Sequence, residues 1–383
     1  MRSHFLKHAS LTAAALLLTA CAGFFDKDNT PEPTPLSDYT AELKPTQRWS
    51  TYTGHGAGDE YLKMSPAIGT NAILTASTKG LVTAVDKNTG HIIWQTDTQL
   101  PILAGPAAGN GVVVVGSRQG DIWALSEATG QLLWKTDVTA EILAKPAIGD
   151  NVVIVKSVDG QVHAYSAQTG KERWSYQQAE PSLILRAASA PVIQNNNVLI
   201  GFASGNLSKF SLQDGRLLWM RPIAQAEGAF AIQRMIDVDA DPVVYNHHLY
   251  AATYQGQISS LDASTGATLW SHDISSYTGM TADEESVYIS DAKGYVWDFN
   301  ANSGLVNWRQ TQLEARTISG PANTNNYIIV GDAEGYLHWL SKKDGHFSAR
   351  VRAGSAIYAA PIVQNNVLYA QTNKGYLVAY TLN

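Results

Sequence analysis

The residues best suited to chemistry in this 383-residue chain are one acidic run and a scatter of ten histidines. The run Asp237-Val238-Asp239-Ala240-Asp241 places carboxylates at alternate positions, as a calcium-binding loop does at its start. Such a loop also needs glycine at its sixth position and glutamate at its twelfth. Pro242 stands at the sixth position and His248 at the twelfth, so we expect no metal at this run.

Catalytic groupings are also missing from the sequence. His247 and His248 are adjacent, so on a strand their side chains would point to opposite faces and could not share a metal. The other histidines lack the spacing of a helical metal motif, and there is neither a Gly-x-Ser-x-Gly motif nor a phosphate-binding glycine loop. We therefore expect no catalytic residues, no metal and no cofactor, and we predict that the protein is not an enzyme.

Cys21 is the only cysteine, so no disulfide can form within the chain. It follows a basic start and an apolar stretch, Leu11 to Leu18, that is too short to span a bilayer. Leu18-Thr19-Ala20-Cys21 resembles the lipobox of bacterial lipoprotein signal peptides. The resemblance implies that residues 1–20 are removed and that Cys21 carries the lipid, while Ala22-Gly23 favours the outer membrane. The alternative is an ordinary secretory signal with a chance cysteine.

The region after Cys21 is rich in proline, with Pro31, Pro33 and Pro35 close together. Proline lacks the backbone donor that a helix or an internal strand needs, so we expect residues 21–45 to form an extended tether. The formal charge of −6 is spread along the chain, which argues against binding to nucleic acid. No later stretch contains eighteen uninterrupted apolar residues, so the lipid is the only membrane attachment that we expect.

The elements that position the remaining residues are set by a repeat. Pro66 is followed by Gly80 after fourteen residues, by Gly90 after ten more and by Trp94 after four more. The same spacing recurs in the copies that begin at Pro106, Pro146, Pro191 and Pro242. The sixth copy has Met280 for proline, the seventh has Ala349 for tryptophan, and the eighth, from Pro361, stops before its turn.

Each copy contains β-branched or alternating segments between turn residues, which indicate four strands, the innermost of them before the proline. Units of about forty residues with four strands are typical of propeller blades. We therefore predict an all-β fold for residues 46–383, an eight-bladed β-propeller of four-stranded antiparallel blades. Gln47-Arg48-Trp49-Ser50 is similar to Glu172-Arg173-Trp174-Ser175, so the N-terminal strand is expected to complete the last blade and close the ring.

The repeated tryptophans could suggest a site for carbohydrate or an aromatic ligand. Their fixed place on the outer strand instead favours a structural role, in which each ring packs on a glycine or small residue of the next copy. The residues concerned are Trp49, Trp94, Trp134, Trp174, Trp219, Trp270 and Trp308.

Two connections between copies are longer than the usual twelve residues from tryptophan to proline. Seventeen residues separate Trp174 from Pro191, and twenty-three separate Trp219 from Pro242. Insertions in repeat proteins form loops that commonly carry binding, and adjacent connections should lie side by side. The first connection contains Leu183 and Leu185 beside Arg186. Aliphatic residues in a loop indicate a surface that a partner covers, unless they fold onto their own blade.

The run Ala84-Val85-Asp86-Lys87-Asn88-Thr89-Gly90-His91-Ile92-Ile93-Trp94 resembles the pyrroloquinoline-quinone (PQQ) propeller repeat. That resemblance implies the propeller fold and raises the alternative of a degenerate quinoprotein-like enzyme. Quinoprotein dehydrogenases have a longer chain, often a vicinal disulfide beneath the quinone, and a calcium site. This chain has no cysteine after Cys21, so the resemblance carries the fold rather than the activity.

Lipobox, proline-rich tether, eight blades, Pro-Ser-Leu-x-Leu-Arg in one insertion and Asp-Val-Asp in the next together resemble the BamB family. Its members are propeller lipoproteins of the outer-membrane β-barrel assembly machinery, on the periplasmic face. The resemblance implies a non-enzymatic scaffold that binds the POTRA domains of the barrel subunit and offers strand edges to unfolded barrel proteins. Carried over by motif, the contact residues are Leu183, Leu185, Arg186, Asp237 and Asp239.

Two features of this chain depart from that family, namely Ile184 in place of a small polar residue and Ala349 in blade seven. A different binding function also stays open, in which the propeller recognises peptidoglycan or a small ligand at its central channel. A polar funnel with convergent side chains would favour that alternative.

Overall fold

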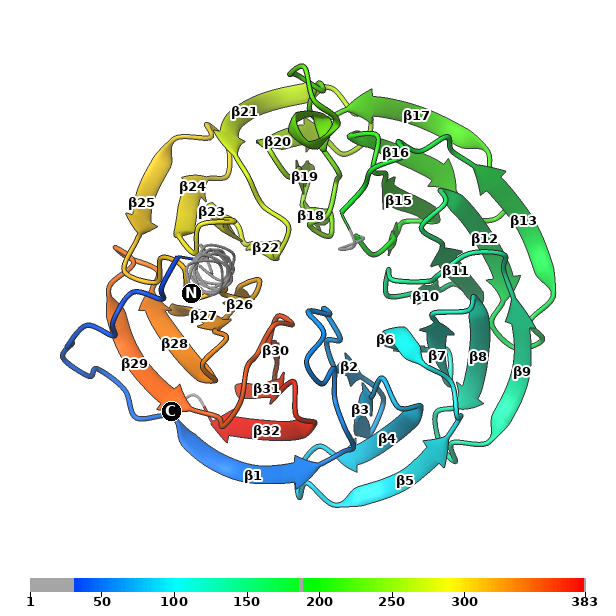
Figure 1. The fold of residues 1–383 in the computed structure, drawn as a ribbon, viewed down its shortest axis with the longest axis horizontal. Coiled ribbons are helices and arrows are strands. Elements are labelled where there is room, and N and C mark those ends of the chain that lie inside the picture. The colour runs from blue at the N-terminus through cyan, green and yellow to red at the C-terminus, as the bar shows by residue number, and fades with distance from the viewer. Residues whose placement is uncertain (1–30, 186–188, 382–383) are drawn as a thin grey trace, which may run out of the picture. The chain divides into compact units, whose positions relative to one another are not determined.

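The computed structural model describes residues 31–185 and 189–381, and residues 34–383 form one compact unit. The expected signal peptide (1–20), Cys21 and Arg186 lie outside the described residues. The compact unit consists of eight four-stranded sheets in a ring, which confirms the predicted eight-bladed propeller (Figure 1). Every pair of neighbouring strands in a sheet is antiparallel; blade one, for example, runs β2-β3-β4-β5 from the centre outwards.

The first four blades follow one another in chain order. Blade one contains β2 (Ala67–Ile68), β3 (Ala72–Ala76), β4 (Leu81–Asp86) and β5 (Ile92–Asp97). Blade two contains β6 (Ile102–Gly109), β7 (Val112–Ser117), β8 (Asp121–Ser126) and β9 (Leu132–Asp137). Blade three contains β10 (Ala147–Gly149), β11 (Val152–Lys156), β12 (Gln161–Ser166) and β13 (Glu172–Gln177). Blade four contains β14 (Val192–Gln194), β15 (Asn197–Gly201), β16 (Asn206–Ser211) and β17 (Leu217–Pro222).

The second half of the ring continues this order up to the last blade. Blade five contains β18 (Val243–Tyr245), β19 (His248–Ala252), β20 (Gly256–Asp262) and β21 (Thr268–Ile274). Blade six contains β22 (Gly279–Ala282), β23 (Ser286–Ser290), β24 (Val296–Asn300) and β25 (Val306–Gln310). Blade seven contains β26 (Ala322–Asn323), β27 (Tyr327–Gly331), β28 (Tyr336–Ser341) and β29 (Phe347–Arg352). Blade eight contains β30 (Ile362–Gln364), β31 (Val367–Gln371), β32 (Tyr376–Thr381) and the N-terminal β1 (Thr46–Tyr52).

The ring closes where the two ends of the compact unit meet. Strand β1 pairs antiparallel with β32, from Thr46 opposite Thr381 to Tyr52 opposite Tyr376. The N-terminal strand therefore supplies the outer strand of blade eight, as the sequence predicts. Without it, β32 would expose a row of unpaired backbone groups at the seam.

The inner strands differ from the prediction in their place relative to the proline. They were expected before it, but β2, β10 and β14 all begin just after it, and only β6 contains its proline, Pro106. Proline has no backbone N–H to donate, so it suits the position just before a strand better than one inside the ladder. The repeat markers identified the blades, while this strand boundary was misplaced by a few residues.

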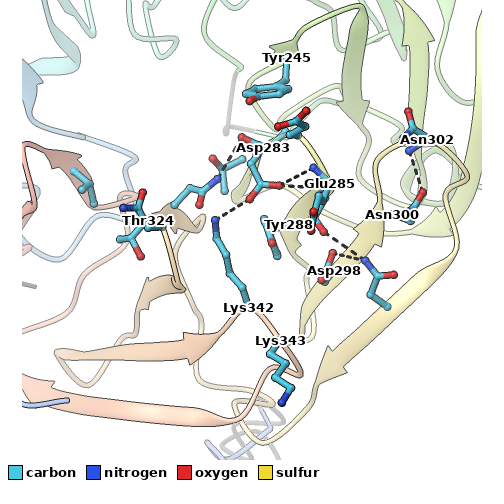
Figure 2. A pocket seen from close by; sticks show the side chains of 18 of the residues that line it. Tyr245, Asp283, Glu285, Tyr288, Asp298, Asn300, Asn302, Thr324, Lys342 and Lys343 are labelled. Carbon is cyan, nitrogen blue, oxygen red and sulfur yellow. Dashed lines mark hydrogen bonds and ion pairs between the residues drawn. The ribbon is translucent and has the colours of Figure 1, made fainter. Parts of the chain in front are cut away.

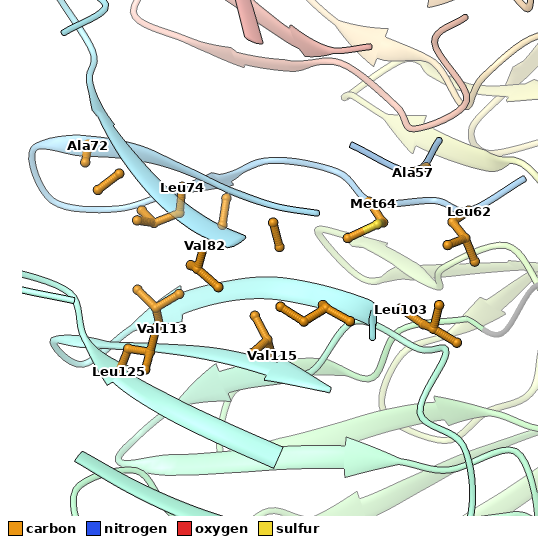
Figure 3. Close-up of a cluster of buried hydrophobic side chains, with 14 residues drawn as sticks. Ala57, Leu62, Met64, Ala72, Leu74, Val82, Leu103, Val113, Val115 and Leu125 are labelled. Atoms are coloured by element: carbon orange, nitrogen blue, oxygen red, sulfur yellow. The ribbon is translucent and has the colours of Figure 1, made fainter. Parts of the chain in front are cut away.

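The core lies between the blades rather than inside any one of them. The middle strands are buried along their whole length, as in β7, because each sheet is covered on both faces by its neighbours. The cluster between blades one and two, for example, joins Leu74 and Val82 to Val113, Val115 and Leu125 (Figure 3). The β-branched runs of the sequence are therefore the two-sided strands of stacked sheets.

Seven of the eight joints between blades are each fastened by one of the repeated tryptophans. The ring of Trp94 covers Gly130 so closely that a Cβ there would stand 2.5 Å from it, which explains the invariant turn glycine of the repeat. The indole Nε1 of Trp94 also donates a hydrogen bond of 2.9 Å to the carbonyl of Glu127, at the start of that turn. The same bond joins Trp49 to Lys87, Trp134 to Ala167, Trp174 to Leu212, Trp270 to Ala301 and Trp308 to Lys342.

Trp219 departs from this pattern. Its ring lies against Gly266 in the usual way, but its indole Nε1 is buried without a hydrogen-bond partner among the described residues. The carbonyl that it would use, that of Ala263, accepts instead from the Lys209 Nζ at 2.8 Å. A lysine on β16 has therefore taken the acceptor that the tryptophan uses elsewhere.

Ala349 replaces the tryptophan of blade seven for a topological reason. The tryptophan needs the hairpin turn between the third and outer strands of the next blade, and in blade eight β32 is not joined to β1 by such a turn. Residues Phe347 to Ala349 are nevertheless buried, whereas Leu132 and Leu133, which match Phe347 and Ser348, are exposed on β9. Another part of the chain must therefore cover β29.

The covering segment is residues 34–45, the N-terminal strap. Glu42 N donates to the carbonyl of Ser348 at 2.9 Å, and the ring of Tyr39 lies 6.3 Å from that of Phe347. Thr34 N donates to the carbonyl of Glu314 at 3.0 Å. The expectation of a free tether over residues 21–45 is therefore wrong from Thr34 onwards. Proline content excludes helix and strand, but it does not prevent an extended segment from packing its aromatic and apolar side chains.

A buried charged cluster holds the strap. The guanidinium of Arg316 donates to the Thr34 carbonyl at 2.8 Å, and that of Arg350 donates to the Ser37 carbonyl at 3.1 Å. Arg316 pairs with the buried Asp332 at 2.8 Å, and His338 lies 2.9 Å from the same carboxylate. Burial alone would raise the pKa of Asp332, but these two partners keep it below its usual range. Arg316 is only 2% exposed, so the cluster belongs to the core of blade seven.

The tryptophan joints generate a matched test. Trp134→Phe keeps an aromatic ring on Gly170 but leaves the buried Ala167 carbonyl without its donor. We expect this variant to lose about 1–3 kcal/mol of unfolding free energy. Trp219→Phe removes no hydrogen bond and should lose clearly less. Denaturant unfolding of both variants checks this, and equal losses would contradict a stabilising role for the indole–carbonyl bond.

Candidate partner-binding site

The two insertions form the most irregular part of the ring. The first insertion (178–191) joins β13 to β14, and the second insertion (223–242) joins β17 to β18. Both connect the outer strand of one blade to the inner strand of the next, so both lie on the same face of the propeller. The second contains a short 3-10 helix, η1 (Ala231–Arg234).

Carboxylates of the second insertion fasten the first one in place. The Asp237 Oδ2 accepts a hydrogen bond of 2.7 Å from the backbone N–H of Leu185. The Asp241 Oδ1 accepts one of 2.7 Å from the backbone N–H of Ala190. Hydrogen bonds to ionised acceptors are stronger than neutral ones. The two insertions therefore lie side by side, as the spacing predicts, and behave as one unit.

The aspartates themselves do not face the solvent. Asp237 and Asp239 were expected to meet a partner's charges, but each is only 2% exposed, so their carboxylates face the interior in this structure. Burial raises the pKa of Asp237 to about 6 and that of Asp239 well above its usual range. Alternation along an extended segment indicates which residues share a face, but it does not tell whether that face is turned inward.

Three lysines and a glutamate complete this buried network. Lys63 reaches from the segment before β2 and donates to the carbonyl of Asp239 at 2.7 Å. Lys156 donates to the carbonyl of Gly201 at 2.6 Å, and burial lowers the pKa of its ammonium group. Lys145 donates to the carbonyl of Pro66 at 3.4 Å. Glu180 accepts from the backbone N–H of Ser204 at 2.9 Å, which ties the start of the first insertion to blade four.

Apolar side chains lie on the solvent-exposed side of this network. Leu183 is 43% exposed and Leu185 is half-buried, while Arg186 lies outside the described residues. Sequence analysis missed Phe230 and Ile232 of the second insertion, which are 69% and 60% exposed. Two large apolar residues in a long connection without strand periodicity were a usable signal for them.

Hydrogen bonds hold the segment that carries Phe230 and Ile232. The side-chain carbonyl of Gln233 accepts from the backbone N–H groups of Ala229 and Phe230, at 3.0 and 3.1 Å. The amide of Gln255, on blade five, donates to the carbonyl of Ile232 at 3.2 Å. These exposed apolar residues are thus presented by an ordered backbone, which lowers the entropy cost of binding.

Neither a membrane span nor a metal cluster is found in the described part of the chain. No helix there is long and apolar enough to cross a bilayer. Within the same residues, no three His, Cys, Asp or Glu side chains gather closely enough to hold a metal ion.

The fold and its repeats define a class, the eight-bladed propellers built from PQQ-type repeats, here with two long insertions on one face. A family model described as outer membrane protein assembly factor BamB matches residues 78–310 and 292–383. A BamB of Legionella pneumophila strain Paris is 45% identical over 352 residues, covering 92% of each chain. The chain therefore belongs to the BamB family.

Solved structures agree with this assignment. The crystal structure of BamB from Moraxella catarrhalis matches 88% of this chain and 100% of its own, with a TM-score of 0.81 and 29% identity. The quinohemoprotein alcohol dehydrogenase of Comamonas testosteroni also matches 88% of this chain and 76% of its own, with a TM-score of 0.72. Its identity is only 13%, so this likeness extends to the fold alone.

The buried Asp237 makes a pH-dependent prediction. Its pKa of about 6 in the folded protein lies above that of an unfolded chain, so the folded state takes up a proton between pH 7 and pH 5. Wild type should therefore gain about 1.4 kcal/mol of unfolding free energy relative to Asp237→Asn over that interval. Unfolding of both proteins at the two pH values measures the gain, and a constant difference between them would show that the pKa is not raised.

Proposed function

We propose that the protein is a non-enzymatic scaffold in the assembly of outer-membrane β-barrel proteins. It binds the periplasmic POTRA domains of the barrel subunit through its paired insertions. The observation that carries this proposal is the pair of 2.7 Å bonds from Leu185 and Ala190 to Asp237 and Asp241, which fasten the two insertions to each other. Membership of the BamB family supports the choice of partner.

The surface has the composition of a binding hot spot. Leu183, Phe230 and Ile232 are apolar and exposed, and Arg186 of the first insertion supplies a positive charge. Apolar anchors at the centre of an interface commonly account for most of its binding energy. Asp237 and Asp239 act from beneath, because their carboxylates lie in the interior. We therefore assign them a positioning role in place of direct contact.

Unfolded barrel segments are proposed to pair with the free edges of the outer strands. Strands β5 and β9 lie at the edges of their sheets. Exposed apolar side chains accompany these edges, namely Ile92, Ile93, Leu132 and Leu133. An edge with unpaired backbone groups accepts a further strand by β-augmentation. The edge of β29 is covered by the strap and is not offered in this way.

Attachment to the outer membrane is proposed to depend on Cys21, with the propeller on the periplasmic face. A diacyl anchor buries many CH₂ groups at about 0.8 kcal/mol each, so two or more chains hold a protein firmly. The alternative of a degenerate quinoprotein-like enzyme draws only on a shared fold, which by itself carries no activity.

The interface proposal is tested by two matched leucines. Leu183→Ala should weaken binding of the full-length protein, in detergent, to purified POTRA domains by about 1–3 kcal/mol. Leu305→Ala serves as the control, because Leu305 is 70% exposed but lies on the outer rim of blade six. Calorimetric titration measures the affinities, and melting curves of the same proteins should barely move.

Two further variants separate binding from folding. Arg186→Glu should weaken binding as Leu183→Ala does, because it reverses a charge at the same surface. Trp134→Ala should instead lower stability by about 3–5 kcal/mol. A folded Arg186→Glu protein that binds like wild type would show that the insertions are not the interface.

The anchor proposal predicts the behaviour of Cys21→Ser. With no thiol to carry lipid, this variant should leave the membrane fraction and appear in the soluble periplasmic fraction. Cell fractionation followed by a high-salt wash measures the distribution. Membrane retention of the variant after the wash would place the anchor elsewhere in the chain.

A further inference from the structure

A large hollow opens on the face of the propeller opposite to the insertions. It has a volume of about 1720 Å³ and is lined by hairpin turns of blades six, seven and eight, together with Tyr245 of blade five. These turns join first to second and third to outer strands, whereas the insertions join one blade to the next. Figure 2 shows Asp283, Lys342 and Tyr288 projecting into the same space from different strands and turns.

The residues around this hollow depart from the repeat in a way that blade packing does not require. Asn323 stands two residues after the proline, where every other blade has an apolar side chain. Those side chains are Ile68, Ala108, Ile148, Ile193, Val244, Ala282 and Val363. Asp298, opposite Trp308, stands where blades one to three have alanine, and Asp283 stands where they have glycine. Asn323 is therefore the departure that no other blade shares, and Asp283 and Asp298 add two carboxylates to the same hollow.

Two of these departures place polar groups in buried positions. The Asn323 Nδ2 donates to the carbonyl of Ala282 at 3.3 Å, but its Oδ1 is buried with no hydrogen-bond partner among the described residues. Asp298 is 2% exposed and accepts from the Asn307 Nδ2 at 3.1 Å. A buried acceptor without a donor destabilises a fold, so turning the Asn323 amide toward a ligand in the hollow would recover a hydrogen bond that this side chain lacks.

The chemistry of the lining selects one class of ligand. Amides and hydroxyls predominate, including Asn302, Asn325 and Thr324, and each of these groups can donate or accept a hydrogen bond. An apolar ligand would find few partners in this hollow. An anionic ligand is disfavoured, because acidic residues outnumber lysines and Lys342 is already paired with Asp283 at 2.7 Å. The volume exceeds that of a typical small-molecule pocket of about 300–1,000 Å³.

We propose that this hollow binds a neutral oligosaccharide, whose hydroxyl groups pair with the amides that line it, including that of Asn323. A sugar hydroxyl donates and accepts at one atom, which matches a lining of mixed donors and acceptors. The proposal does not depend on the scaffold function, because it concerns the opposite face.

The experiment titrates the full-length protein in detergent with chitotetraose and maltotetraose, monitored by calorimetry. We expect at least one of them to bind with a Kd of about 1 mM or tighter. Asn323→Ile should weaken binding about tenfold while leaving the melting temperature unchanged or higher, because isoleucine is the residue of three other blades at this position. Loss of binding without loss of stability is a result that a merely structural role for Asn323 would not produce.

A matched asparagine pair controls for the turns themselves. Asn302→Ala lies in the hollow, whereas Asn88→Ala changes the same turn position in blade one, outside it. Only the former should weaken oligosaccharide binding. An anionic tetragalacturonate should bind less well than either neutral probe. The proposal is overturned if wild type binds neither neutral probe, if Asn323→Ile binds them as wild type does, or if the anionic sugar is preferred. POTRA binding by the same preparations is expected to stay unchanged, so failure here is distinct from failure of the scaffold proposal.

Discussion

The structure depends on one constraint, which is that no blade can bury both of its faces unless the ring is complete. Each sheet is apolar on both sides, and its only cover is the sheet before it and the sheet after it. The indole of one blade packs on the turn glycine of the next at every joint except that between blades seven and eight, where the strap covers β29. Closure by β1 on β32 is therefore a requirement of the whole core rather than a local detail.

Much of this could be read from the sequence because the constraint repeats. A spacing that returns in every copy reveals the blades, and the truncated eighth copy pointed to Trp49 as its missing outer strand. The sequence did not reveal the contacts of segments that occur only once in the chain. The strap packs through Tyr39 and Glu42 on a strand distant in sequence, and the guanidinium groups of Arg316 and Arg350 also hold it. No local pattern encodes such a pairing.

The candidate site, too, could be predicted from the sequence only in part. Insertion lengths located both loops and their adjacency correctly, since these follow from the order of the blades. Whether Asp237 points to solvent or to the interior depends on how the two insertions fold against each other, since its carboxylate accepts from the backbone N–H of Leu185. Carboxylates buried beside lysines and backbone donors act as fasteners, and the apolar residues above them are then held still. In this region the buried charges hold the backbone that carries the exposed apolar residues.

Docking of the strap also shortens the segment between Cys21 and the propeller. If Cys21 carries the lipid as proposed, thirteen residues separate it from Thr34, which the Glu314 carbonyl holds, rather than the twenty-five that separate it from Thr46, where β1 begins. Thirteen residues span at most about 45 Å, roughly half of what the longer segment would allow. Glu314 lies in a connection between two blades, as both insertions do. Thr34 is therefore bound on the face of the propeller that carries the insertions. Under the proposed anchoring, this limit would keep that face close to the membrane and raise its effective concentration toward a membrane-embedded partner.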